Sequence, residues 1–152
     1  MISPLVFSCP YDAVTYVDGI AGLIVSREGK NQTQLFICQP WVEVPEHCHL
    51  NVDTNLIYLS GCMVVRHNSK VYTFNETCTI PRGTSLHIRP GEFHSLSVGA
   101  IGGAFLSEQS WTRGNPDSTE LDWVGQPIGK AHAARLVQKL NKTERDYARK
   151  SS

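Results

Sequence analysis

The sequence has little charge and no charge imbalance. Only 18 % of its 152 residues are charged, and 14 Lys and Arg residues are matched by 14 Asp and Glu residues. A globally basic surface of the kind that binds nucleic acid is therefore not expected. The balance hides a division along the chain: residues 1–129 hold seven basic and twelve acidic residues, whereas residues 130–152 hold seven basic and two acidic ones.

Long apolar runs, a secretory leader and paired cysteines are also missing. No apolar run approaches the roughly 18 residues that a membrane span needs, so no membrane association is expected. The first residues have no basic region and prolines interrupt their apolar stretch, which argues against a signal peptide. The five cysteines follow no CxxC or zinc-finger spacing. Reduced thiols in a cytoplasmic protein are the expectation.

Short β-strands separated by turn residues are what the chain does contain. The segments between Tyr11 and Glu108 are rich in Val, Ile, Thr, Tyr and Phe and are bounded by Gly, Asn, Asp, Ser and Pro. Because no helices alternate with these segments, they predict an all-β protein with a single antiparallel sandwich or barrel. The expected strands are Ala13–Asp18, Ile20–Arg27, Gln34–Gln39, Trp41–His49, Leu56–Leu59, Met63–Arg66, Lys70–Phe74, Thr77–Ile80, Ser85–Ile88, Phe93–Val98 and Gly103–Ser107.

The chain changes character after this β-rich part, which spans residues 1–108. Residues 109–129 are polar, are punctuated by Gly and Pro, and contain Trp111 and Trp123, so they predict an irregular loop that wraps the body or links to the next segment. Residues 130–152 predict a basic C-terminal amphipathic α-helix and tail. The apolar face of this helix would hold His132, Leu136, Val137, Leu140 and Tyr147.

Three histidines have the spacing of a metal site. Alternate residues of a strand point to the same face, so His47 and His49 can present two imidazoles to one point. A Pro90-Gly91 turn precedes His94 and would swing a third imidazole towards a neighbouring strand. Three neutral imidazoles bind one divalent transition metal, such as Fe, Mn, Ni, Cu or Zn, and leave positions open for water or substrate.

At these residues the chain resembles the cupin family. The first cupin motif is Gly, five residues, His-x-His, three or four residues, Glu, six residues and Gly. His47, His49 and Gly61 fit this pattern, whereas Trp41 stands at the first glycine and Thr54 at the glutamate. The second motif is Gly, five residues, Pro-x-Gly, two residues, His, three residues and Asn. Gly83, Gly91 and His94 fit it, whereas the proline is displaced to Pro90 and Val98 stands at the asparagine.

The resemblance implies a small cupin-type β-barrel, or jelly roll, with a metal held in its mouth by His47, His49 and His94. It also implies a homodimer, which unpaired edge strands and an amphipathic helix favour independently. The missing glutamate leaves three alternatives open. Asp53 or Asn55 takes its place if a bulge re-aims the strand, or the site holds its metal with histidines alone, as in some cupin dioxygenases, or the site has decayed and binds no metal.

Three classes of function are compatible with these residues. The first is a mononuclear metalloenzyme of dioxygenase, isomerase or lyase type that acts on a small organic substrate, with His87 and Asp53 as candidate catalytic groups. The second is a non-catalytic module that binds or senses a small ligand. The third is a structural or interaction protein that uses the tryptophan-containing loop and the basic helix. The fold alone does not choose among them.

Overall fold

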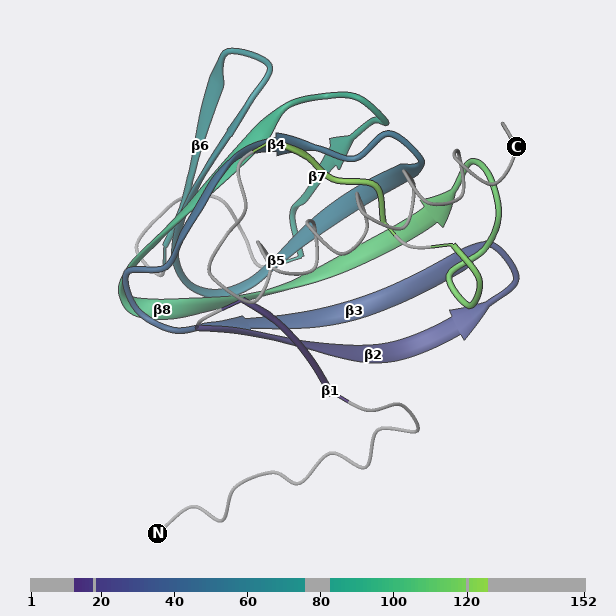
Figure 1. Ribbon diagram of the computed structural model, residues 1–152. Coiled ribbons are helices and arrows are strands. Elements are labelled where there is room, and N and C mark those ends of the chain that lie inside the picture. The colour runs from purple at the N-terminus through teal and green to yellow at the C-terminus, as the bar shows by residue number, and fades with distance from the viewer. Residues whose placement is uncertain (1–12, 18, 76–82, 120, 126–152) are drawn as a thin grey trace, which may run out of the picture.

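The computed structural model describes residues 13–17, 19–75, 83–119 and 121–125, which form an antiparallel β-structure (Figure 1). The predicted all-β class is therefore confirmed. The strands are β1 (Ala13–Val17), β2 (Ile20–Glu28), β3 (Asn31–Cys38), β4 (Glu43–Cys48), β5 (Val52–His67), β6 (Lys70–Phe74), β7 (Ser85–Ile88), β8 (His94–Trp111) and β9 (Val124–Gly125).

Two long strands, β5 and β8, hold the barrel together and lie side by side along its length (Figure 1). The first half of β8 pairs with β4 and with the second half of β5, whereas its second half pairs with β3 and with the first half of β5. The barrel therefore has one wall around β4 and the first half of β8 and another around β3 and the second half of β8. β5 and β8 each take part in both walls. β1 and β2 extend one wall beyond β3, and β6 and β7 pair with opposite ends of β5.

Glycines allow β5 and β8 to cross closely where the pairing changes register. The register shifts between Tyr58 and Ser60 and again between Gly61 and Met63. Gly61 has a φ of 89°, and a Cβ atom added to it would lie 2.2 Å from the carbonyl oxygen of Gly102 and 2.4 Å from the Cα atom of Gly103. Only glycine combines this left-handed conformation with so close a backbone approach.

The apolar core fills the part of the barrel next to this bend. Phe36, Phe105 and Tyr58 lie opposite one another on three adjacent strands, and the rings of Phe36 and Phe105 stack with centroids 5.1 Å apart. Such cross-strand aromatic pairs stabilise a sheet beyond their buried area. The buried residues of this core are Ile20, Cys38, Val44, Tyr58, Met63, Val65, Phe74, Leu96 and Val98.

Farther from the bend, the inward-facing side chains of β3 and β8 are polar. Gln32, Gln34, Ser107 and Gln109 are buried and joined by their side chains. The Gln32 amide donates to Gln109 Oε1 at 2.9 Å, and the Gln109 amide donates to Gln34 Oε1 at 2.8 Å and to Ser107 Oγ at 3.1 Å. These hydrogen bonds offset the cost of burying amides, which is large when they are left unpaired.

The structure differs from the sequence predictions mainly in the lengths of the strands. Segments expected as separate strands, at 56–59 and 63–66 and again at 93–98 and 103–107, merge into β5 and β8. Trp41 precedes β4 with a φ of 65° and is largely exposed, so it is not a strand residue. β8 continues to Trp111, and β9 lies within the segment expected to be irregular.

The strand predicted at 77–80 and the helix predicted within 130–152 lie outside the described residues. Within the described part of the chain, no helix is long and apolar enough to cross a membrane.

Candidate metal centre

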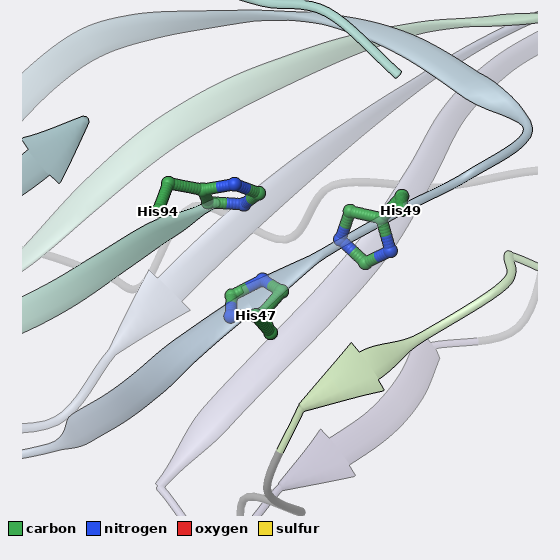
Figure 2. A group of neighbouring side chains, drawn as sticks. All are labelled: His47, His49 and His94. Atoms are coloured by element: carbon green, nitrogen blue, oxygen red, sulfur yellow. The ribbon is translucent and has the colours of Figure 1, made fainter. Parts of the chain in front are cut away.

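Three histidines from neighbouring strands converge in the barrel (Figure 2). His47 on β4 lies directly opposite His94, the first residue of β8, and His49 follows the end of β4. The ring centroids of His47 and His94 are 4.2 Å apart, and those of His47 and His49 are 5.1 Å apart. The proposed ligand set is thus brought together by the pairing of β4 with β8.

Each of the three imidazoles is oriented by a backbone carbonyl. The Nδ1 atom of His47 is 2.8 Å from the carbonyl oxygen of Pro45, that of His49 is 3.0 Å from that of Asp122, and that of His94 is 3.1 Å from that of Glu92. Because a carbonyl only accepts, Nδ1 carries the proton in all three rings and the lone pair lies on Nε2. Metal-binding histidines are typically held in this way.

The donor set fits a first-row divalent metal. One nitrogen from each ring lies within 4.8 Å of the other two. Ligand bonds of about 2.0–2.1 Å around a tetrahedral ion require nitrogens roughly 3.3 Å apart, so small side-chain rotations close the set. Three neutral imidazoles leave the charge of such an ion intact and leave positions for further ligands.

Burial keeps two neighbouring groups of the site in their neutral form. The pKa of His94 is lowered, chiefly because burial disfavours the imidazolium, although the hydrogen bond to the Glu92 carbonyl opposes this in part. A neutral imidazole is the form that binds a metal. Burial also raises the pKa of the Cys48 thiol, which lies between two of the histidines in the sequence. A protonated thiol is a poor ligand.

Trp123 covers one side of the centre. Its indole stacks on the His47 ring with centroids 3.7 Å apart and planes within 7°, and it meets the His49 ring edge-on at 5.6 Å. The preceding Asp122 is held by its backbone amide, which donates to Asn51 Oδ1 at 3.1 Å, while β9 pairs with β4 beside His47. The tryptophan-containing segment therefore folds over the site.

The two predicted catalytic residues lie together but outside the three-histidine group. The Nε2 atom of His87 is 2.7 Å from Asp53 Oδ1. The pairing of β5 with β8 is continuous from Val52 to Tyr58, so no bulge re-aims Asp53 or Asn55. Since Leu86 packs against the core, His87 points to the opposite, outer face of the sheet. Both side chains are more than a third exposed, and their catalytic role stays a prediction.

Thr54, which stands where the cupin motif has its glutamate, faces the barrel interior. Thr54 lies opposite Gln109 on one side and buried Ile88 on the other. Directly opposed residues share a face, so Thr54 lies on the inner wall beside the buried amides. No carboxylate from β5 joins the three histidines, which are the group that could hold a metal within the described part of the chain.

Sequence reasoning does not single out His67, which stands next to a turn. It is buried, and it lies opposite His94 across β5 and β8. Its Nε2 atom is 3.1 Å from Glu92 Oε2. Alternation along the strand could have indicated its burial. Met63 and Val65 are buried, and His67 is the next residue on the same face.

Two hollows lie away from the histidines. One, of about 350 Å³, is lined by Ile37, Ile101, Ala104 and residues of the glycine bend. The other, of about 20 Å³, lies within the apolar core. None of the three histidines lines either hollow, so the arrangement of their nitrogen atoms, and not a cavity, identifies the candidate site.

Solved structures share this architecture at low sequence identity. KdgF from Halomonas sp. is 14 % identical, with a TM-score of 0.58, and the match covers 68 % of this chain and 90 % of that one. An RmlC-like cupin from Shewanella frigidimarina NCIMB 400 is 13 % identical, also with a TM-score of 0.58, and the match covers 78 % and 97 %. The cupin domain of Cnp3 from Schizosaccharomyces pombe is 10 % identical, with a TM-score of 0.54, and the match covers 67 % and 69 %.

No protein-family model matches the chain, and no match was found among curated proteins. The likeness to solved structures therefore concerns the fold, and it agrees with the cupin-type barrel that the spacing of the histidine motifs implies. The chain has a jelly-roll fold like that of these cupin structures.

Proposed function

We propose that the chain binds one divalent transition metal through His47, His49 and His94 and acts as a mononuclear metalloenzyme on a small organic molecule. The observation that carries this proposal is the shared orientation of the three rings, each with Nδ1 on a backbone carbonyl. A structural histidine has no need of two neighbours oriented in the same way. When bound, the metal supplies Lewis acidity and, if it is iron, dioxygen chemistry.

The expected substrate is anionic and binds through oxygen. Three neutral imidazoles do not offset the charge of a divalent ion, and no carboxylate joins them among the described residues. An enolate, catecholate or 2-hydroxy acid therefore gains more from this centre than a neutral molecule does. On the protein side, the Trp123 indole and the backbone of Asp122 limit the approach of water to the His47 and His49 rings.

Metal titration followed by tryptophan fluorescence tests the binding step. Because Trp123 stacks on His47, paramagnetic Cu(II) or Co(II) at the centre is expected to quench its emission with a one-to-one end point. Zn(II), which does not quench, is expected to compete with them. The Trp123→Phe variant should lose the quenched component, since Trp123 is the indole that lies directly against His47 and His49. Quenching that never saturates at one equivalent contradicts the proposal.

Oxygen uptake separates an enzyme from a module that only binds or senses a ligand. The stacking of Trp123 over His47 favours the binding module as the second candidate, because it restricts access to the centre. Iron-loaded protein is screened against β-diketones, catecholates and 2-hydroxy acids. The enzyme proposal predicts a change in the visible spectrum together with oxygen consumption. A spectral change without oxygen consumption supports the binding module. If none of the compounds changes the spectrum or the oxygen trace, both the enzyme and the binding module are refuted.

We further propose a homodimer formed through the outer face of the β2–β3–β8–β5 wall. Leu23, Leu35, Leu106 and Ile57 lie opposite one another across these four strands on the side away from the core. Exposed Ile37 and Ile101 border the adjacent hollow. An aliphatic surface of this kind presents identical side chains to a two-fold partner, as a symmetric dimer requires.

Light scattering at micromolar concentration checks the dimer. The native chain should have twice the monomer mass, and Ile101→Lys should shift it towards the monomer because the lysine places a charge in the contact. Val71→Lys is the matched control, since Val71 is also exposed but lies on β6. A monomeric native chain overturns this proposal.

A further inference from the structure

A carboxylate next to the third histidine joins two turns that border the metal centre. Glu92 follows the Pro90-Gly91 turn, in which the Glu92 amide donates to the Arg89 carbonyl at 3.1 Å and Gly91 has a φ of 82°. This is a type II turn, with proline and glycine at the positions that such a turn favours. The Gly91 amide donates to the His49 carbonyl at 2.8 Å, so the turn is also tied to a second ligand residue.

The Glu92 side chain reaches from this turn to the neighbouring hairpin. Its carboxylate accepts from the Asn68 side-chain amide, from His67 Nε2 at 3.1 Å and from the Arg89 backbone amide at 2.8 Å. The carboxylate is therefore held from both turns, by His67 and Asn68 on one side and by the Arg89 amide on the other.

The hairpin that Glu92 contacts has a tight turn of defined geometry. Asn68 and Ser69 form a two-residue turn between β5 and β6, with φ values of 51° and 62°. Positive φ at both central residues defines a type I′ turn, for which asparagine is well suited. Because the Asn68 side chain is directed to Glu92, the hairpin and the Pro90-Gly91 turn hold each other in place.

The Glu92 backbone completes the link to the metal ligand. Its carbonyl oxygen is the acceptor for His94 Nδ1 at 3.1 Å, so the direction of the His94 ring depends on where Glu92 is held. We infer that Glu92 is a positioning residue, whose carboxylate anchors its own carbonyl and thereby aims His94 at the metal. This inference rests on the proposed metal site. Partners of this kind typically change metal affinity 10–100-fold when they are removed.

Metal affinity in four proteins tests the inference. Glu92→Ala is expected to weaken Co(II) or Zn(II) binding by about 10–100-fold. Asn68→Gly, which keeps a residue suited to positive φ and removes only the side-chain donor, should weaken binding by a smaller factor in the same direction. Glu43→Gln is the matched control, because Glu43 is an exposed carboxylate on β4 that accepts from Ser97 Oγ at 2.7 Å. Its affinity should stay within about twofold of the native value.

The visible spectrum of the Co(II)-saturated protein distinguishes positioning from a general loss of stability. A displaced His94 ring alters the ligand field, so the Glu92→Ala spectrum should differ from the native one even at full occupancy, whereas the Glu43→Gln spectrum should not. If Glu92→Ala changes neither the metal affinity nor the spectrum, the role inferred for Glu92 is wrong, while the proposed metal site still stands. If the native protein itself binds neither Co(II) nor Zn(II), the proposed function fails and this inference fails with it.

Discussion

Replacing His94 by alanine is expected to lower the affinity for a divalent transition metal by about 100-fold or more, which corresponds to about 2.7 kcal/mol. The loss should exceed that of a residue that only orients a ligand, because one of three donor nitrogens is removed. Burial also lowers the pKa of His94, which favours the neutral imidazole that a metal requires. Isothermal titration with Zn(II) or competition with a chromophoric chelator measures the change.

His87→Ala is the control for this variant. It removes the same side chain from the outer face of the sheet, where His87 pairs with Asp53 and does not belong to the three-histidine group. Its metal affinity should match that of the native protein to within about twofold. Equal losses in the two variants would show that the third ligand has been assigned incorrectly.

Gly61→Val is expected to cost more than about 4 kcal/mol of unfolding free energy, enough to leave little folded protein. The added Cβ would lie 2.2 Å from the Gly102 carbonyl oxygen, and a φ of 89° is strained for a β-branched residue. Both neighbours are backbone, so a side-chain rotation does not relieve the contact. Circular dichroism and urea unfolding measure the loss.

Gly29→Val is the control for Gly61→Val, because it separates the strain of a positive φ from the close backbone contact at the bend. Gly29 also has a positive φ, of 58°, but no heavy atom lies within 4 Å of a Cβ added there. The strain of the conformation is therefore present without the backbone contact. We expect a loss of about 1–2 kcal/mol at Gly29. Similar losses at both positions would contradict the close approach of β5 and β8.

The all-β class and the grouping of His47, His49 and His94 could be predicted from the sequence. Strand alternation places His47 and His49 on one side, and the Pro90-Gly91 turn lies before His94, so local chemistry specifies this part of the site. The bends in β5 and β8 were not predictable in the same way. Gly61 reads as a turn signal that ends a strand, whereas in the structure it pairs with Gly103 and both strands continue through the bend.

The surroundings of the site depend on long-range contacts that no local pattern encodes. Trp123 is held over His47 by contacts between distant parts of the chain, namely the bond from the Asp122 amide to Asn51 and the pairing of β9 with β4. The pairing of His67 with Glu92 likewise joins two turns 25 residues apart. The outward direction of Asp53 follows from an unbroken register between β5 and β8, which the sequence of either strand does not specify by itself.

Elemental analysis of the purified chain, prepared without a histidine tag, tests the central claim most directly. The three-histidine group predicts close to one first-row transition metal per chain, and occupancy should fall strongly when His47 and His49 are both replaced by alanine. A native protein that contains no metal, and that takes up none of Fe, Mn, Ni, Cu or Zn after loading and desalting, would contradict the claim.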